Sequence, residues 1–403
     1  MGGLTLPAAD WRRRAGLDTL CAALGAGDGD ARFVGGIVRD TLLGVEAHDI
    51  DIATRLAPDV VVQRLRASHI KAIPTGIAHG TITAVLPDGT VEVTTLRRDL
   101  TTDGRHATIA FTDDWRADAA RRDFTINALY ADPVTGAVFD YFGGQDDLAA
   151  RRVRFIGDPL QRIAEDHLRI LRFFRFLARF GDTPDAKGLA ACAARANDLM
   201  ALSRERIADE LLKLLVAANA PAIVALMIDH GIFAPVLPEI TSAERLARVA
   251  GVEAAAGLAP NAIRRLAAVL PDDTTLGDNI GARLKLSNLQ RRRLATALTA
   301  EPAPPRVLAY RLGLDGAADR LTLHLPSNEA LAALATITDW TPRRLPLSGG
   351  DLVARGLRKG PDVARTLRAI EDQWIAEDFP GDDRLAAITD AALDQALRST
   401  NNS

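Results

Sequence analysis

The sequence predicts an α+β protein in which a small mixed sheet is followed by a long, all-helical remainder. Strand signals are confined to the first ~140 residues, where short apolar or alternating runs are separated by turn residues, at 31–34, 48–53, 81–86, 90–96 and 137–141. From about residue 159 onward, helical periodicity rich in Ala and Leu takes over, as in 204–216 after the cap residue Ser203. A chain of 403 residues that is 48% hydrophobic can form two or more globular units.

The composition is that of an ordinary globular protein. Its most hydrophobic stretch, 222–237, is interrupted by Asp229 and Pro235, and the N-terminus has no apolar signal core, so we expect no membrane span and a cytoplasmic location. Cys21 and Cys192 lie far apart without a metal-ligand pattern, which disfavours a disulfide framework or a zinc site. Because the formal net charge is -3, any contact with nucleic acid must use local basic patches.

A glycine pair, Gly35-Gly36, stands between the strand at 31–34 and a helical run at 37–43. Glycine lets the backbone turn tightly and offer its N–H groups, at a helix N-terminus, to an anion such as a triphosphate. Arg39 lies about one helical turn further on, where it can add a charge-assisted contact. Taken alone, such a turn is also common in proteins where it binds nothing.

Two acids, Asp49 and Asp51, follow on a predicted strand. Residues i and i+2 of a strand point to the same face, about 7 Å apart, so both carboxylates share a face while Ile50 turns toward the core. Mg²⁺ would relieve their repulsion, because it prefers oxygen ligands and bridges to substrate phosphates. An isolated pair of this kind could instead be two surface acids on a solvated edge strand.

A second block begins with Arg121-Arg122 and contains Asp123 and Asn127. Adjacent arginines can neutralise phosphates, whereas Asp and Asn can bond to ribose hydroxyls, which would favour ribonucleotides. A charged helix start without any function would produce a similar string.

A third block, 165–177, places apolar residues on one face of a predicted helix. Asp166, Arg169 and Arg172 fall three apart, so Asp166 and Arg169 should project together. A carboxylate accepts from an exocyclic amine and a guanidinium donates to ring acceptors, so the pair can satisfy the edge of cytosine or adenine and reject uracil or guanine. Salt bridges on a helix surface are the alternative.

These blocks, GGIVRDTLLG with Asp49-Ile50-Asp51, RRDFTINAL, and EDHLRILRFFRF, together resemble bacterial-type (class II) tRNA CCA-adding enzymes and poly(A) polymerases. The resemblance implies a polymerase-β-like nucleotidyltransferase head at 1–142, a base-selecting neck at 143–205, a helical body at 206–280 and a helical, tRNA-binding tail at 281–403.

The same resemblance implies roles for individual residues. The glycine turn and Arg39 would hold the triphosphate, Arg122 would contact the nucleotide and Asp123 the sugar, and the neck pair would select the base. A third acid usually lies on a neighbouring strand, where Glu92 could stand or could make an ordinary cross-strand ion pair. The predicted catalytic residues are Asp49, Asp51 and Glu92, with Mg²⁺ on the two aspartates, and the predicted nucleotide-binding residues are Gly35, Gly36, Arg39, Arg122, Asp123, Asn127, Asp166, Arg169, Arg172 and Arg175.

Residues 77–83 and 92–99 resemble the CCA-adding branch more closely. We therefore expect transfer of CMP, CMP and AMP, from CTP and ATP, to the 3′ end of tRNA with release of pyrophosphate, without a nucleic-acid template and without an obligate protein partner. A poly(A) polymerase, an enzyme that adds only CC or only A, and a catalytically silent RNA-binding protein are the alternatives.

Four further segments carry expectations. The block 203–211 should brace the neck, and the polar segment 99–114 is similar to a mobile loop that in relatives helps to switch from C to A addition. Two basic clusters should contact RNA phosphates unless they are merely solvated faces; they are Arg283, Lys285, Arg291, Arg292 and Arg293, and Arg343, Arg344, Arg355, Arg358 and Lys359.

Overall fold

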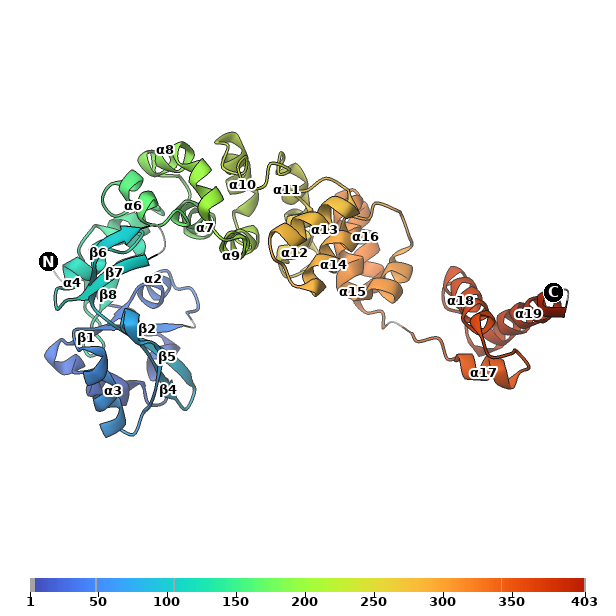
Figure 1. The fold of residues 1–403 in the computed structure, drawn as a ribbon, viewed down its shortest axis with the longest axis horizontal. Helices are drawn as coiled ribbons and strands as arrows, with labels where there is room; N and C mark the ends of the chain where they lie inside the picture. Colours follow the sequence, from blue (N-terminus) through green and yellow to red (C-terminus); the bar gives the residue numbers. More distant parts are fainter. Residues whose placement is uncertain (1–3, 48, 104–105, 342, 402–403) are drawn as a thin grey trace. The chain divides into compact units, whose positions relative to one another are not determined.

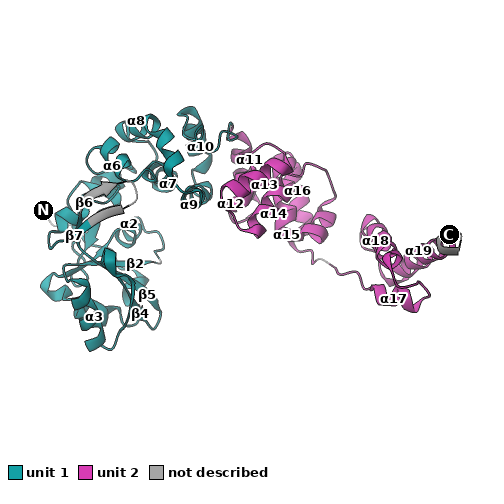
Figure 2. Cartoon of the chain, viewed as in Figure 1, with its two compact units in different colours: residues 1–241 teal, residues 242–403 magenta. Residues whose placement is uncertain are grey.

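The computed structural model describes residues 4–47, 49–103, 106–341 and 343–401 (Figure 1). They fall into two compact units, 1–241 and 242–403 (Figure 2). The division lies within the stretch expected to be the helical body, and the limits of the four expected regions remain predictions. No helix in the described part of the chain combines the length and apolar character that crossing a membrane requires.

A seven-stranded mixed sheet lies in the first unit, with the strand order β3-β4-β5-β2-β1-β8-β9. The pairing of β2 with β5 is parallel, whereas the other neighbours in this order are antiparallel. The strands are β1 (Ala31–Val34), β2 (Ile50–Thr54), β3 (Lys71–Gly76), β4 (Thr81–Leu86), β5 (Gly89–Thr95), β8 (Leu129–Ala131) and β9 (Val138–Asp140).

Most of these strands follow from alternation in the sequence. Along β4, the side chains of Ile82, Ala84 and Leu86 are buried and the residues between them are partly exposed, as expected for a half-buried strand. The strands expected at 31–34 and 81–86 are confirmed to the residue, and the other three are confirmed with ends shifted by one or two residues. Residue 48, the expected start of one of them, lies outside the described residues.

A second, two-stranded sheet pairs β6 (Arg97–Asp103) with β7 (His106–Phe111) in antiparallel fashion. The segment 99–114, expected as a loop, is therefore mainly a hairpin. Its polar residues concealed the strand signal, because they lack the apolar alternation by which a half-buried strand is recognised. Residues 104–105 lie outside the described residues.

Helices surround the sheet and then replace it along the chain (Figure 1). Beyond β9 the described residues form helices and turns, which confirms the expected all-helical remainder. The α-helices of the first unit are α1 (Leu17–Ala23), α2 (Gly36–Leu42), α3 (Pro58–Ala67), α4 (Trp115–Ala120), α5 (Gly144–Ala149), α6 (Pro159–Glu165), α7 (Arg169–Phe180), α8 (Ala186–Ala194), α9 (Arg204–Leu215) and α10 (Ala220–Asp229).

Aromatic packing fixes α7 against two segments, one that precedes β8 and one that follows β9 in the chain. Phe173 stacks on Phe155 with ring centroids 5.5 Å apart and planes inclined by 9°, and Phe176 lies 5.3 Å from Phe124. Buried aromatic side chains contribute large apolar areas, so this cluster stabilises the orientation of α7. The same helix carries a row of arginines, Arg169, Arg172, Arg175 and Arg179, and two of them, Arg172 and Arg175, lie over the ring of Phe176.

The prediction of a single helix through 165–177 is wrong in one respect, because the helix is interrupted between α6 and α7. Asp166 is extended, with φ -151° and ψ 107°, and its Oδ1 accepts from the amide of Leu168 at 3.1 Å. An Asp side chain that bonds to a nearby amide competes with helical hydrogen bonding, which accounts for the interruption.

The described residues of the second unit form helices and turns and include the following two hydrophobic clusters. One is centred on Ala309, Leu321 and Leu334, the other on Leu352, Ile370 and Trp374. The helices are α11 (Glu244–Ala255), α12 (Ala262–Ala267), α13 (Thr274–Arg283), α14 (Asn288–Ala297), α15 (Pro305–His324), α16 (Ser327–Thr338), α17 (Gly349–Ala354), α18 (Pro361–Ala376) and α19 (Asp382–Asn401).

Candidate active site

A cavity of about 820 Å³ in the first unit gathers the predicted site residues from blocks that are distant in the sequence. This volume is within the usual range for sites that bind small molecules. Every predicted site residue except Glu92 lines it. The lining residues are Gly35, Gly36, Ile37, Arg39, Asp40, Glu46, Ala47, Asp49, Asp51, Arg97, Arg121, Arg122, Asp123, Asn127, Asp166, Arg169, Arg172, Arg175, Phe176 and Arg179.

The lining of the cavity carries many basic and many acidic side chains. It contains eight arginines and six acidic side chains, so the cavity suits a ligand that has anionic groups at one place and hydrogen-bond donors at another. A nucleoside triphosphate has this distribution, because its phosphates carry the negative charge and its base presents amine and ring nitrogen atoms.

The turn between β1 and α2 requires glycine at its first position. Gly35 has φ 72° and ψ -123°, a conformation that residues with a side chain rarely adopt. Its amide donates to the carbonyl of Leu129 at 3.0 Å, because β1 pairs with β8, and so it is not available to a phosphate. The expectation that this turn offers both of its amides to an anion is therefore corrected to exclude Gly35.

Asp49 and Asp51 flank the buried Ile50 at the start of β2, as the alternation predicted. In the parallel pairing of β2 with β5, Asp51 stands opposite Glu92. Burial and the negative charges of Glu92 and Asp49 raise the pKa of Asp51 to about 6, although Arg122 acts in the opposite sense. Three carboxylates therefore lie within electrostatic range of one another.

Glu92 has Asp51 and Thr83 as its partners on the two adjacent strands. Neither is cationic, so the register gives no support to a cross-strand ion pair, the alternative considered for Glu92. Its assignment as the third active-site acid stays a prediction.

The donor set of Asp49 and Asp51 fits Mg²⁺. Among the described residues, no group of three or more His, Cys, Asp or Glu side chains is already arranged to hold a metal ion. Mg²⁺ does not require one, because it commonly binds one or two protein carboxylates and completes its octahedron with substrate phosphates and water. Both aspartates line the cavity in which such phosphates would lie.

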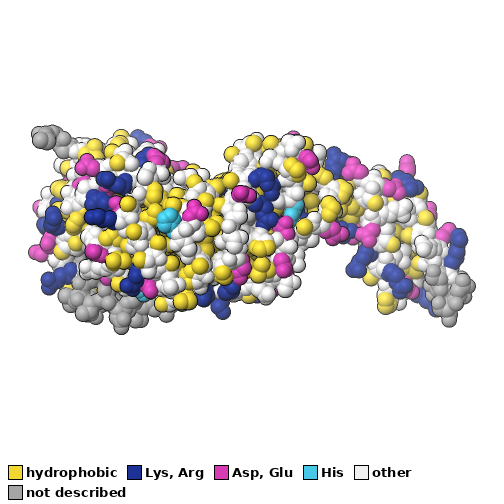
Figure 3. All heavy atoms as spheres, turned by 90° about the horizontal axis from the view of Figure 1, so that it is seen from above, with side chains coloured by type: hydrophobic (Ala, Val, Ile, Leu, Met, Phe, Trp, Pro, Cys, Tyr) yellow, Lys and Arg dark blue, Asp and Glu magenta, His cyan; other side chains and the backbone are white. Residues whose placement is uncertain are grey.

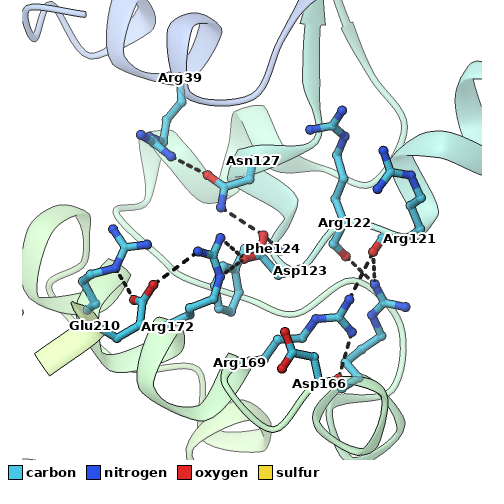
Figure 4. Close-up of polar contacts among 12 residues, drawn as sticks. Arg39, Arg121, Arg122, Asp123, Phe124, Asn127, Asp166, Arg169, Arg172 and Glu210 are labelled. Atoms are coloured by element: carbon cyan, nitrogen blue, oxygen red, sulfur yellow. Dashed lines mark hydrogen bonds and ion pairs between the residues drawn. The ribbon is translucent and has the colours of Figure 1, made fainter. Parts of the chain in front are cut away.

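A chain of hydrogen bonds, completed by one ion pair, runs from α2 to α9 across one wall of the cavity (Figure 4). Arg39 donates to Oδ1 of Asn127, whose Nδ2 donates to Asp123 at 3.0 Å. Asp123 in turn accepts from Nη2 of Arg172 at 2.6 Å, and Arg172 lies 3.6 Å from Glu210.

Burial alone would raise the pKa of Asp123, but Arg172 and Asn127 lower it overall, so the carboxylate is ionised at neutral pH. Arg175 also pairs with Glu210. Two of the predicted site arginines are therefore held by one acid of the block 203–211, which agrees with the bracing role expected for that block.

The predicted base-selecting pair lies at the break between α6 and α7. Asp166 accepts from Nη2 of Arg206 at 2.9 and 3.1 Å, and Arg169 donates to Glu165 at 2.6 Å and to the carbonyl of Arg162 at 2.8 Å. Each member of the pair is thus held by a partner of opposite charge, and both line the cavity. Figure 4 shows the two side chains near one another below Arg121 and Arg122.

Sequence reasoning missed several residues of the site. Arg97 and Arg179 line the cavity but were not predicted, and Arg121, which was recognised as part of an arginine pair able to neutralise phosphates, was left out of the predicted site residues. Arg179 was detectable, because it continues the spacing of the arginine row on α7. Arg206, which holds Asp166, lies in the block 203–211 that was expected to brace the neck, but its partner could not be predicted, since it is 40 residues away and comes near only in the folded chain.

Some members of the two predicted basic clusters are paired within the protein. Arg291 binds Asp278 at 2.8 Å, Arg293 binds Asp319 at 2.6 Å, and Arg355 pairs with Asp390. Figure 3 shows that basic side chains lie next to acidic ones on the face that is drawn. The clusters are therefore less available to RNA than their sequence suggests, and their contact with RNA stays a prediction.

Two family descriptions match the chain: "Poly A polymerase head domain" over residues 31–154 and "Probable RNA and SrmB- binding site of polymerase A" over residues 183–244. The chain is 36% identical over 379 residues to CCA tRNA nucleotidyltransferase 1, mitochondrial, of Mus musculus, and this alignment covers 89% of this chain and 86% of that protein. It is 32% identical over 394 residues to the CCA-adding enzyme of Levilactobacillus brevis, which covers 90% and 94%.

Among solved structures, the CCA-adding enzyme of Bacillus stearothermophilus in complex with CTP superimposes with a TM-score of 0.73 and 27% identity, covering 96% of this chain and 99% of that one.

Proposed function

The chain belongs to the family of CCA-adding tRNA nucleotidyltransferases, and on that ground we propose that it adds CMP, CMP and AMP, taken from CTP and ATP, to the 3′ end of tRNA. Pyrophosphate leaves as the 3′ oxygen forms its bond to the α-phosphorus. One observation carries the proposal: a single cavity joins Asp49 and Asp51, at the beginning of β2, to Asp166 and Arg169 at the break between α6 and α7.

The triphosphate would lie against the basic wall that Arg39, Arg121 and Arg122 provide. Guanidinium groups bind phosphate oxygens in charge-assisted, often paired hydrogen bonds. Arg122 retains its proton in this wall, because Tyr130 and Asp118 more than offset the effect of burial on its pKa. A fixed positive charge would neutralise the phosphates and the departing pyrophosphate.

Asp123 and Asn127 support the adjacent wall. Resemblance assigns Asp123 to the sugar, but its oxygens already accept from Arg172, Asn127 and the amide of Phe124. Four N–H groups, two of them from Arg172, already occupy the roughly four acceptor positions of this carboxylate, so a ribose hydroxyl can be accepted only if it shares a position with one of those donors or displaces it. We infer that Asp123 contacts the ribose and at the same time fixes Arg172.

Base selection would rest on Asp166 and Arg169. The carboxylate accepts from the exocyclic amine of cytosine or adenine, and the guanidinium donates to ring acceptors, whereas uracil and guanine would set a carbonyl oxygen against the carboxylate. Arg206 and Glu165 hold the two groups in place, and a template held in this way needs no nucleic-acid strand.

Asp49 and Asp51 would hold Mg²⁺, with Glu92 as a third acid on the adjacent strand. The ion, when bound, supplies Lewis-acid stabilisation of the transferring phosphoryl group and of the attacking hydroxyl. Burial of Ile50 keeps both aspartates on the cavity side of β2. The arginines of the cavity offset the charges of the aspartates and of a bound nucleotide with its metal, so the net charge of the occupied site would be close to zero.

The RNA would be held chiefly by the helical remainder, in which basic side chains outside the ion pairs described above contact phosphates. The complete protein would need neither a membrane nor an obligate protein partner. Its cytoplasmic location stays a prediction.

Incubating the protein with tRNA that lacks its last three nucleotides, Mg²⁺ and each NTP in turn tests the proposal. We expect two CMP additions with CTP alone and one AMP addition when ATP follows. An extended A tail would instead indicate a poly(A) polymerase, and arrest after CC or activity only on tRNA ending in CC would indicate a partial enzyme. Tight tRNA binding without incorporation would refute the proposed activity.

A further inference from the structure

A buried carboxylate on α4, Asp118, lies behind the basic wall of the cavity without lining it. Its exposed fraction is 1%, and it comes three and four residues before Arg121 and Arg122. Burying an ionised carboxylate costs free energy unless its oxygens are fully hydrogen-bonded, so the partners of Asp118 show how this charge is stabilised.

Both oxygens of Asp118 are engaged. Oδ1 accepts from Nε of Arg121 at 2.9 Å and from the amide of Arg97 at 3.2 Å, and Nη2 of Arg121 forms an ion pair with the same oxygen at 2.9 Å. Oδ2 accepts from the hydroxyl of Tyr130 at 2.7 Å and from Nη2 of Arg122 at 3.2 Å. Nε of Arg122 donates to the same hydroxyl at 3.2 Å, which closes a ring of three groups.

These contacts connect Asp118 to three arginines that line the cavity. Two are held by their guanidinium groups, and Arg97 is held by its amide at the first position of β6. Figure 4 shows the side chains of Arg121 and Arg122 extending in a common direction from their backbone, whose carbonyls accept from Arg162. Without an opposing charge, two adjacent guanidinium groups would repel each other and separate.

The electrostatic balance agrees with this arrangement. Burial would raise the pKa of Asp118, yet Arg122, Arg121 and the Tyr130 hydroxyl lower it to about 2. The carboxylate is therefore charged at every pH at which the protein would work.

We propose that Asp118 is a positioning residue for the triphosphate: it holds Arg121 and Arg122 in the orientation that receives the β- and γ-phosphates, and it touches no ligand itself. This inference rests on the proposed function only in taking a nucleoside triphosphate as the ligand. Asp118 orders the side chains of Arg121 and Arg122 before the nucleotide binds, and this reduces the entropic cost of ordering two long side chains upon binding.

Binding of CTP and of CMP to the full-length protein, with Mg²⁺ and without tRNA, tests the proposal by calorimetry. Asp118→Asn keeps the size of the side chain and removes its charge. We expect the dissociation constant for CTP to rise about tenfold, as for the loss of one charge-assisted contact, and that for CMP to change less than about twofold, because CMP lacks the β- and γ-phosphates. Asp59→Asn, at an exposed position of α3, is the matched control and should leave both constants unchanged.

A merely structural role would weaken CTP and CMP binding alike, so an unchanged ratio of the two constants overturns the proposal. Tyr130→Phe provides the second variant where Asp118→Asn does not fold. It keeps the carboxylate but removes the hydroxyl shared with Arg122, and it should raise the CTP constant about threefold with CMP unaffected. No shift in that ratio in folded Tyr130→Phe also overturns the proposal.

The outcomes distinguish an error in the positioning role of Asp118 from an error in the proposed function. If the wild-type protein binds CTP in an Asp118-dependent way but adds no CMP to tRNA, the proposed function is wrong and the positioning role stands. If CMP addition is normal while the Asp118→Asn protein retains the wild-type ratio, only the positioning role is wrong.

Discussion

Base selection depends in our account on the charge of Asp166, so Asp166→Asn should relax the preference for CTP over UTP before it abolishes transfer. The carboxylate accepts from the amide of Leu168 and from Arg206, and an Asn oxygen can keep either contact, so the break between α6 and α7 should persist. What the variant loses is the negative acceptor for the amine of cytosine. In its place, the Asn amide group can donate to O4 of uracil.

A hydrogen bond to a charged group contributes about 1.5–3 kcal/mol, which corresponds to roughly 10- to 150-fold in a ratio of rates. The side chain of Asp166 is 31% exposed, so solvent screens part of this energy and the lower end applies. We therefore expect the ratio of kcat/KM for CTP to that for UTP to fall about tenfold.

Single-nucleotide incorporation into tRNA that lacks its last three nucleotides measures both constants. Asp209→Asn, an exposed acid on α9 that pairs with Lys213, serves as the matched control and should retain the wild-type ratio. A folded Asp166→Asn protein whose CTP:UTP ratio stays within twofold of wild type would refute the assignment of Asp166 to base selection.

Three further outcomes are expected. Asp49→Ala should reduce CMP incorporation by at least about a thousandfold while the dissociation constant for tRNA changes less than twofold; retained turnover would remove Asp49 from the catalytic residues. Glu210→Gln, which weakens the hold on two cavity arginines, should raise KM for both CTP and ATP several-fold and lower the melting temperature, and equal KM values would contradict the bracing role. In the second unit, Asp319→Ala should lower the free energy of unfolding by about 3 kcal/mol, because it removes the buried carboxylate that pairs with both Arg264 and Arg293, although Arg264 keeps Glu253 and Arg293 keeps Asp315. Asp315→Ala at an exposed position should have little effect, and similar denaturation midpoints for the two variants would argue against this buried network.

The parts of the site that were predictable from the sequence depend on local geometry. The turn at Gly35 follows from its position between an apolar strand and a helix, and its positive φ agrees with the choice of glycine. The shared face of Asp49 and Asp51 follows from alternation about the buried Ile50. Roles taken from the family resemblance added identities that such patterns alone do not provide.

The parts that were not predictable depend on partners far away in the chain. The register that places Asp51 opposite Glu92 arises from parallel pairing of β2 with β5, between which α3, β3 and β4 intervene. Asp118 resembled any helical acid until its contact with Tyr130 was known.

The neck and the basic clusters show the limits of periodicity. The apolar pattern of residues 165–177 continues through the break at Asp166, because a side chain that bonds to a nearby amide leaves the hydrophobic spacing unchanged. Similarly, clustered arginines are indistinguishable in sequence from an RNA-binding surface, although Asp278 and Asp319 pair with Arg291 and Arg293 in the folded unit.

A crystal structure of the full-length protein with CTP and Mg²⁺ tests the central claim most directly, namely that one cavity receives the base at the neck and the triphosphate at the head. The account predicts the cytosine amine about 2.7–3.2 Å from Asp166, phosphate oxygens against Arg121 and Arg122, and metal density at Asp49 and Asp51. Cytosine bound away from Asp166 and Arg169, or metal density remote from both aspartates, would contradict it.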